Sequence, residues 1–107
     1  MKQVDVMKRD NILVAFLAQH RGMANCVSSS EICKHLNECG YKTQKESVHG
    51  LIRRIMFERT LPICSINGKG YFWAETQDEI QSAIYEFQGR IYEMQDRIEL
   101  LNKFILK

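Results

Sequence analysis

Long hydrophobic runs are missing from this 107-residue sequence. The longest, from Ile12 to Ala18, falls far short of the ~20 apolar residues that a membrane-crossing helix needs. No basic-then-apolar N-terminus resembles a secretion signal, so we expect a cytoplasmic protein without a membrane partner. Proline is scarce too, with Pro62 alone. The hydrophobic content of 45% is ordinary for a globular chain and favours a folded protein over disorder.

Groups that bind metals or carry out catalysis are also sparse. The candidates are Cys26, Cys33, Cys39, Cys64, His20, His35 and His49. The cysteines form no C-x-x-C pair, so we expect reduced thiols and no zinc site. The histidines are predicted on three different helices without a paired acid or serine, and no glycine-rich phosphate loop opens a helix. We therefore expect neither an enzyme nor a bound cofactor or metal.

The formal net charge of +2 conceals an uneven distribution. Up to Ala74 the chain has eleven Lys or Arg and six Asp or Glu, a balance of +5. From Glu75 onward four basic residues meet seven acidic ones, a balance of −3. The basic part of the chain is therefore the part expected to contact a polyanion.

What the sequence does contain is a heptad repeat in its last third. Isoleucine recurs every seventh residue, and a second apolar series alternates with it at spacings of four and three. The eight seam positions are Ile80, Ile84, Phe87, Ile91, Met94, Ile98, Leu101 and Ile105. A straight helix drifts about 20° per heptad against this spacing, so the strict repeat favours supercoiling with a second helix. The alternative is an amphipathic helix packed on its own chain.

The orientation and size of this assembly are less firmly specified. Isoleucine at every a position favours a parallel pair, and an antiparallel pair would bring Arg90 toward Arg97. Tyr85 and Tyr92 add a second apolar strip, and the segment from Leu100 to Leu106 is apolar nearly all round. We expect this end to contact the partner's N-terminal domain, a second dimer in a tetramer, or another protein.

Three capping boxes predict helix starts, because each has a hydroxyl three residues before a glutamate. They begin at Ser28, Thr43 and Thr76. With the apolar stripe that precedes them, they predict helices over 8–21, 29–39, 44–58 and 76–106. Gly22 is expected to end the first helix, and Gly40 suits the left-handed position after the second.

Between the third helix and the heptads the apolar period changes from helical to extended. Two β-prone runs, 63–66 and 71–74, flank Asn67-Gly68-Lys69-Gly70. Asn-Gly between such runs predicts a hairpin turn in which both residues take positive φ. A short strand near Val27 could join this hairpin. The predicted fold is mainly α with a small β-hairpin, arranged as a domain over 1–75 and a helix over 76–107.

The second and third helices are joined by only Gly40-Tyr41-Lys42-Thr43, a turn typical of a helix-turn-helix. The runs 61–65 and 68–74 resemble the wing of bacterial winged helix-turn-helix domains, such as those of biotin-operon repressors and small phage regulators. The resemblance covers about 8–75. It implies a recognition helix over 48–55 and a wing tip beside the DNA backbone. At Arg59-Thr60 the chain departs from the family, which usually has a glycine there.

The exposed face of the predicted third helix suits contact with bases and phosphates. Gln can pair with adenine, and Arg with guanine or a phosphate. Gly50 within a helix costs about 1 kcal/mol relative to alanine, which suggests close approach by another backbone. The residues expected to contact DNA are Gln44, Lys45, Ser47, His49, Gly50, Arg53, Arg54 and Lys69.

These patterns favour a homodimeric, sequence-specific DNA-binding protein, either a small transcriptional regulator or a replication-associated factor of a bacterium or phage. Its partners would be double-stranded DNA and a second copy of itself. The alternative is an adaptor or inhibitor that uses the same fold and its apolar C-terminal helix to bind a protein, because fold alone does not decide function.

Overall fold

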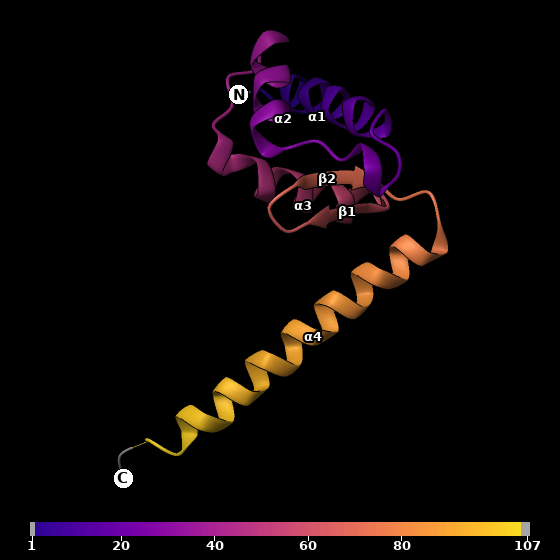
Figure 1. Cartoon of the computed structure of the whole chain (residues 1–107). Coiled ribbons are helices and arrows are strands. Elements are labelled where there is room, and N and C mark those ends of the chain that lie inside the picture. Colours follow the sequence, from indigo (N-terminus) through magenta and orange to yellow (C-terminus); the bar gives the residue numbers. More distant parts are fainter. Residues whose placement is uncertain (1, 106–107) are drawn as a thin grey trace.

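The computed structural model describes residues 2–105, which form the predicted helices and one antiparallel hairpin. The elements in chain order are α1 (Gln3–Ala18), the short 3₁₀ turn η1 (Met23–Asn25), α2 (Ser29–Glu38), the 3₁₀ turn η2 (Lys45–Ser47), α3 (Val48–Arg59), β1 (Ile63–Ile66), β2 (Gly70–Trp73) and α4 (Gln77–Asn102). The predicted fold class is thus confirmed as mainly helical with a small hairpin and a long C-terminal helix. Figure 1 shows α4 projecting from the packed residues 2–75, called the head from here on.

The core of the head lies between the three short helices and the hairpin. Apolar faces predicted from the helical spacing supply most of it, and each fully buried large side chain contributes roughly 1.5–3 kcal/mol. The largest fully buried side chains are Leu13, Leu17, Val27, Ile32, Leu36, Val48, Ile55 and Phe72. Four residues predicted in the same stripes are only half-buried at its edge: Ile12, Phe16, Cys33 and Leu51.

The first helix is displaced toward the N-terminus relative to the predicted 8–21. It begins at Gln3, where Asp5 in the first turn suits the positive end of the helix dipole. It ends at Ala18, because the next residues bond to the hairpin instead: the His20 carbonyl accepts from the Trp73 amide at 2.8 Å, and the Gly22 amide donates to the Trp73 carbonyl at 2.9 Å. Gly22, with φ of +84°, therefore lies beyond the helix end.

The hairpin has a three-residue loop, since Ile66 pairs with Gly70. The Lys69 amide donates to the Ile66 carbonyl at 3.0 Å, a turn that needs a left-handed residue only at its third position. Gly68 occupies that position with φ of +81°. The prediction of positive φ at Asn67 is wrong for this reason.

Val27 joins the hairpin, as the sequence predicts. Its amide donates to the Tyr71 carbonyl at 2.7 Å, and its carbonyl accepts from the Tyr71 amide at 2.8 Å. Gly70 permits this approach, because a Cβ there would lie 2.1 Å from the Val27 carbonyl oxygen. The strand near Val27 is confirmed as a single bridge.

Two of the three predicted capping boxes start helices. The Ser28 hydroxyl accepts from the Glu31 amide at 3.1 Å at the start of α2, and Thr76 and Glu79 form a complete box at the start of α4. The predicted box at Thr43 is wrong. Its amide and carbonyl both bond to the Asn37 side chain, at 2.8 and 3.1 Å, and its hydroxyl donates to Tyr41. The chain consequently enters α3 through η2.

The ends of α2 and α3 both use left-handed residues. Gly40 follows α2 with φ of +91°, as predicted. α3 ends one residue later than predicted, at Arg59, and Thr60 takes the left-handed conformation with φ of 55°. Because a β-branched residue rarely adopts this conformation, Thr60 stores strain at the end of α3.

α4 extends about 39 Å from the head, at 1.5 Å per residue over 26 residues. None of its residues is buried, and its seam side chains from Ile84 to Ile105 are 43–66% exposed. The alternative that this helix packs on its own chain is therefore wrong for the described part of the protein. α4 also ends earlier than predicted, because bonds from Lys103 to Leu100 and from Phe104 to Leu101 tighten the last turn. Ile105 lies past that end, and Leu106 lies outside the described residues.

None of the described helices combines the length and apolar character needed to cross a membrane.

Candidate nucleic-acid interface

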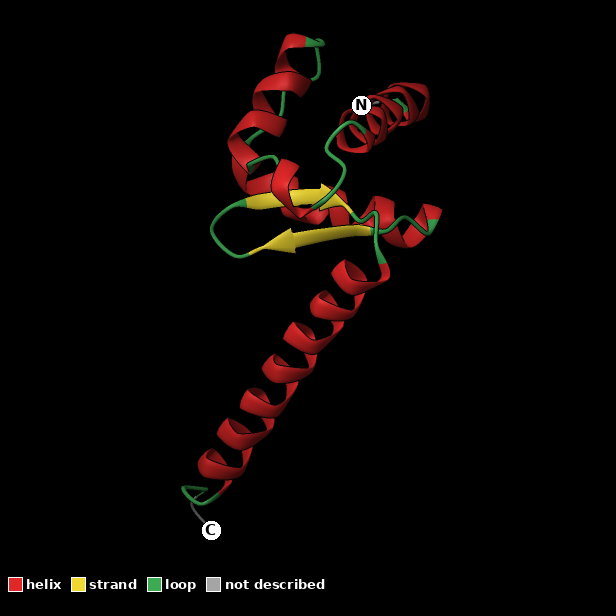
Figure 2. Ribbon diagram, turned by 45° about the vertical axis from the view of Figure 1, so that its right-hand side comes forward, coloured by secondary structure: helices red, strands yellow, loops and turns green. Residues whose placement is uncertain are grey.

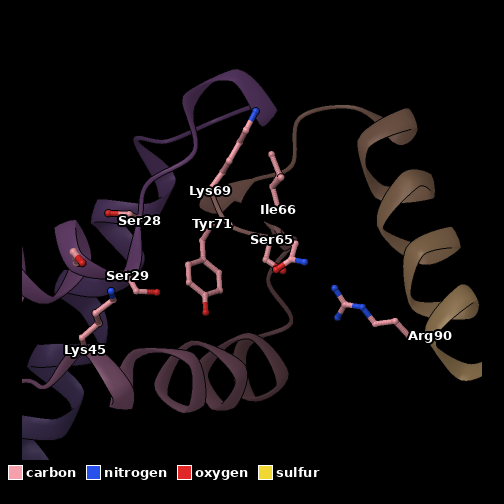
Figure 3. Close-up of a pocket in the computed structure, with 12 residues that line it drawn as sticks. Ser28, Ser29, Lys45, Ser65, Ile66, Lys69, Tyr71 and Arg90 are labelled. Carbon is pink, nitrogen blue, oxygen red and sulfur yellow. The ribbon is translucent and has the colours of Figure 1, made fainter. Parts of the chain in front are cut away.

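A polar groove of about 410 Å³ lies between the start of α2, the hairpin and α4. Most of its lining residues are small and polar, and three are cationic. The lining residues are Ser28, Ser29, Ser30, Lys45, Ser65, Ile66, Asn67, Gly68, Lys69, Gly70, Tyr71 and Arg90. Figure 3 shows Lys45 and Arg90 entering the groove from opposite sides, with Tyr71 between them and the Lys69 amine pointing away from Tyr71. Backbone N–H groups at the start of α2 add to the positive character of this surface.

A second, apolar groove of about 630 Å³ continues from the first, between α3, β1 and the first turns of α4. It is lined by His49, Ile52, Arg53, Met56, Phe57, Leu61, Pro62, Ile63, Cys64, Ser65, Tyr71, Ile80, Ala83, Ile84, Phe87 and Arg90. The two grooves share three residues: Ser65, Tyr71 and Arg90. α4 leaves the head beside the end of β2 and diverges from the hairpin, so the space between them widens toward the hairpin loop (Figure 2).

The residues predicted to contact DNA divide between these grooves. Lys45 and Lys69 line the polar groove, and His49 and Arg53 line the apolar one. Three further candidates line neither groove but are exposed near the start of α3: Gln44, Ser47 and Gly50. Seven of the eight candidates are thus exposed to solvent.

Arg54 is the exception, because its guanidinium is engaged within the head. Arg54 Nη2 donates to both carboxylate oxygens of Asp10 at 3.0 Å, and Nη1 donates to Glu58 at 2.9 Å. The hydrogen bond to Asp10 is the main reason that the pKa of Arg54 is raised. Since Asp10 is only 4% exposed, this pair fastens α3 to α1. The structure therefore gives Arg54 a structural partner in place of the free face that the sequence suggested.

His49 and Gly50 sit differently on α3. His49 Nδ1 lies 3.1 Å from the Tyr71 hydroxyl, so the helix and the hairpin are joined where the two grooves meet. A Cβ built on Gly50 would meet nothing within 4 Å. No packing within the described chain requires a glycine here.

The cationic residues of the grooves differ in how far their charge is engaged. Arg90 pairs with Glu86 at 3.0 Å and lies over the Phe87 ring, and Arg53 lies 5.6 Å from the Phe57 ring centre. Among residues 2–105, Lys45 and Lys69 have no carboxylate within ion-pair distance. These two lysines are consequently the groups most available to an anionic ligand.

The position of α4 depends on one carboxylate of its own capping box. Glu79 Oε2 accepts from the Met23 amide at 2.6 Å, and Oε1 accepts from the Glu75 amide at 2.8 Å and the Thr76 amide at 3.2 Å. These hydrogen bonds lower the pKa of Glu79, and the bond from the Glu75 amide has the largest effect. They fix the start of α4 against η1 and hence the direction in which Arg90 points.

The sequence reasoning missed Arg90 and Tyr71 as groove residues. The heptad position of Arg90 suggested only a role beside the seam, and its place opposite Lys45 depends on the direction of α4. Tyr71 belonged to a predicted strand, but the face it occupies could not be assigned. Only the serines at the start of α2 carried a usable signal, because a helix N-terminus attracts anions.

The contacts of the cysteines and histidines include one between a thiol and an imidazole, 3.9 Å from Cys39 Sγ to His35 Nε2 at the end of α2. All four cysteines are free thiols, and burial raises the pKa of Cys64. His20 and His35 both lie against the Phe16 ring, at centroid distances of 4.9 and 4.1 Å. Within the described residues no group of three or more His, Cys, Asp or Glu could hold a metal ion.

No protein-family model matches the chain, and no curated protein or solved structure matches it either. The function is therefore argued from the site alone.

Proposed function

We propose that the chain is a sequence-specific DNA-binding protein that acts as a homodimer, with a winged helix-turn-helix head and α4 as its dimerisation helix. Such a protein would serve a bacterium or phage as a small transcriptional regulator or a replication-associated factor. The proposal includes a cytoplasmic location, where duplex DNA is accessible.

The observation that carries this proposal is the charge of the two adjoining grooves. Four cationic side chains line them, Lys45, Lys69, Arg53 and Arg90, and no Asp or Glu is among the lining residues. A surface that concentrates one sign of charge in concave form attracts a polyanion of the opposite sign. The phosphates of DNA would be neutralised by these side chains, and each would release counterions on binding.

The order of elements supports duplex DNA as the polyanion. α2, a short turn, α3 and a hairpin follow one another, with Val27 bridged to β2. In a winged helix-turn-helix this order presents the third helix to the major groove and the hairpin loop to the backbone. Gln44, Lys45 and Ser47 would then meet base edges and phosphates at the start of α3, and Lys69 would contact a phosphate from the wing.

The exposed seam of α4 supports action in pairs. A helix with no buried residue gains little stability from its own chain, and helices of this length are marginal in water unless they pack on something. Seven apolar seam positions on one projecting helix, with Ile105 just past its end, form a surface that favours association. Two heads joined in this way predict a pseudo-palindromic site with half-sites one or more helical turns apart.

Fluorescence anisotropy with a labelled random-sequence duplex, measured across a salt series, tests the proposal. We expect micromolar or tighter binding at low salt that weakens steeply as salt rises. Lys45→Ala and Lys69→Ala should each lower the slope of log affinity against log salt by about one unit. Lys34→Ala is the matched control, because Lys34 is exposed on α2 and lines neither groove. Absence of binding at low salt would overturn the proposal.

The second candidate is an adaptor that binds a protein, and the apolar groove is the observation that favours it. Phe57 on its rim is 72% exposed, and most of the lining is apolar. An adaptor would bind no duplex at low salt, whereas Phe57→Asp would abolish binding of its protein partner. The charge distribution of the grooves makes DNA binding the better supported of the two.

A further inference from the structure

Two apolar surfaces at opposite ends of α4 have no partner within the described chain. One is the apolar groove at the base of the helix. The other, called the tip, consists of Leu100, Leu101, Phe104 and Ile105, all of them more than half exposed. The tip cannot reach the groove of its own chain, because the helix continues straight for about 15 Å from Arg90, the last α4 residue of the groove, to Leu100.

We propose that the α4 helices of two copies pair antiparallel, so that the tip of each copy fills the apolar groove of the other. The pairing itself rests on the proposed function, but the antiparallel direction and the tip-in-groove contact go beyond it. In this arrangement the groove and the tip, both otherwise exposed to water, cover each other. A twofold axis relates the two copies, so the dimer contains two identical groove–tip contacts.

The heptad seam fits an antiparallel register along its whole length. Antiparallel coiled coils place a residues opposite d residues of the partner. One register satisfies this at every seam position: Ile80 opposite Ile105 of the partner subunit, Ile84 opposite Leu101 of the partner subunit, Phe87 opposite Ile98 of the partner subunit, and Ile91 opposite Met94 of the partner subunit. The outermost layer joins Ile80 to a residue just past the end of the partner's α4, because the helix ends at Asn102.

The shape of the groove disfavours a parallel pair. In a parallel pair the two copies of Ile80 would face each other, and both heads would crowd the same end of the coil. Ile80 and Ala83 are already half-buried where α4 contacts β1, so little room remains there for a second helix start and its head. Figures 1 and 2 show the ribbon of α4 closest to the head at its first turn, so a second head would have to be placed at this same point in a parallel pair.

Side chains beside the seam are consistent with the same register. Ala83, the smallest residue at its heptad position, would face the large Phe104 of the partner subunit. Arg90 would approach Arg97 of the partner subunit, but Arg90 is paired with Glu86 at 3.0 Å, which reduces the repulsion. Every other flanking contact joins neutral amides. The like-charge pair that favours a parallel arrangement in the sequence is therefore a small effect beside the fit of groove and tip.

The arrangement leaves the basic end of the head uncovered. A helix lying along the seam follows α4, and α4 diverges from the hairpin (Figure 2). The tip would cover Met56, Phe57 and Leu61 near the base of α4, whereas Lys45 and Lys69 line the other groove. DNA contact by these two lysines and tip insertion are thus compatible, whereas Arg53 and Arg90 line the filled groove and would lie beside the partner helix instead of contacting DNA.

Site-specific photo-cross-linking tests the inference in the full-length chain. A Phe104→p-benzoylphenylalanine variant is prepared in isotopically light and heavy forms, mixed, irradiated and mapped by mass spectrometry. We expect light–heavy products that join position 104 to residues 56–63 or 80–87 of the other copy. The same photoreactive residue at Lys103, the exposed residue directly after α4 and outside the seam, is the matched control and should give few such products.

Other outcomes overturn the inference and are distinguishable from failure of the proposed function. Light–heavy products joining position 104 to residues 98–107 would indicate a parallel pair, which leaves the DNA-binding dimer standing. A dimer in sedimentation without any light–heavy product would also contradict the tip contact. A protein that sediments as a monomer would contradict the pairing of two copies, and with it both the inference and the proposed homodimer. As a second variant, Phe57→Asp alters a side chain exposed in the head and should raise the dimer Kd at least tenfold, whereas an unchanged Kd would contradict the inference.

Discussion

Glu79 and Met23, 56 residues apart in the sequence, are joined by a hydrogen bond of 2.6 Å from the Met23 amide to the Glu79 carboxylate. The same carboxylate caps α4 by accepting from the amides of Glu75 and Thr76. One side chain therefore both starts the helix and fixes its direction relative to the head. The width of both grooves depends on this contact.

The Glu79 contact should make the stability of the protein depend on pH in the acidic range. The pKa of Glu79 is lowered from its ordinary value of 4.5, mainly by the backbone amide of Glu75 and then that of Met23. A lowered folded-state pKa contributes stability above the unfolded value, and that contribution disappears as pH falls through the folded value. Wild type should thus unfold at a higher temperature than Glu79→Gln near neutral pH, with the difference shrinking below pH 4.5. A difference that persists unchanged into strong acid would contradict this assignment.

The ion pair between Asp10 and Arg54 should matter for folding. Removing Arg54 would leave the buried Asp10 carboxylate with its longer contact to Arg9 Nη2, at 3.5 Å, and because Arg54 is 37% exposed, solvent screens part of the effect. We expect Arg54→Ala to lower the free energy of unfolding by about 2 kcal/mol, measured by urea denaturation. Arg53→Ala, on the exposed side of the same helix, should change it by less than about 0.5 kcal/mol. Equal effects of the two substitutions would rule out a special role for the pair.

Thr60 offers a stabilising substitution. Its left-handed conformation, with φ of 55°, costs an L-residue with a branched side chain roughly 1–2 kcal/mol, and glycine avoids this cost. Part of the gain is offset by the greater freedom of glycine in the unfolded chain. Thr60→Gly should therefore raise the free energy of unfolding by about 1 kcal/mol, whereas Arg59→Gly, inside the helix, should lower it. A destabilised Thr60→Gly would show that the threonine side chain makes a contact worth more than the strain.

Substitution of Gly50 should change the stability of the protein and its affinity for DNA in opposite directions. A Cβ at this position would meet no atom of the described chain within 4 Å, so Gly50→Ala should stabilise α3 by about 0.5–1 kcal/mol. If another backbone approaches this point, the same substitution should weaken duplex binding. Thermal unfolding and anisotropy on one preparation measure both effects. A stabilised variant with wild-type DNA affinity would mean that the glycine is incidental.

Local features of the fold could be predicted from the sequence, because their causes lie within a few residues. The hairpin, the left-handed Gly40 and the caps at Ser28 and Thr76 all depend on neighbouring side chains and amides. The error at Thr43 arose because Asn37, six residues earlier, bonds to it and competes with the capping geometry. A local motif fails when a nearby side chain offers a better partner.

The arrangement of the candidate site could be predicted only in part. Residues on the exposed side of α3 were identified from helical spacing, since the opposite side had to be apolar. The ion pair of Arg54 could not be identified in this way, because its partner Asp10 lies 44 residues earlier on another helix. The entry of Arg90 into the polar groove depends on the direction of α4, which the Glu79 contact sets across the fold. Long-range contacts of this kind leave no periodic signal in the sequence.

The central claim is that α4 joins two copies whose heads bind duplex DNA. Sedimentation equilibrium of the full-length chain, alone and with a labelled duplex at low salt, tests it most directly. We predict a free mass of twice the 12.5 kDa of one chain, and a complex in which two chains bind each duplex. A chain that sediments at 12.5 kDa, or that leaves the mass of the duplex unchanged, would contradict the account.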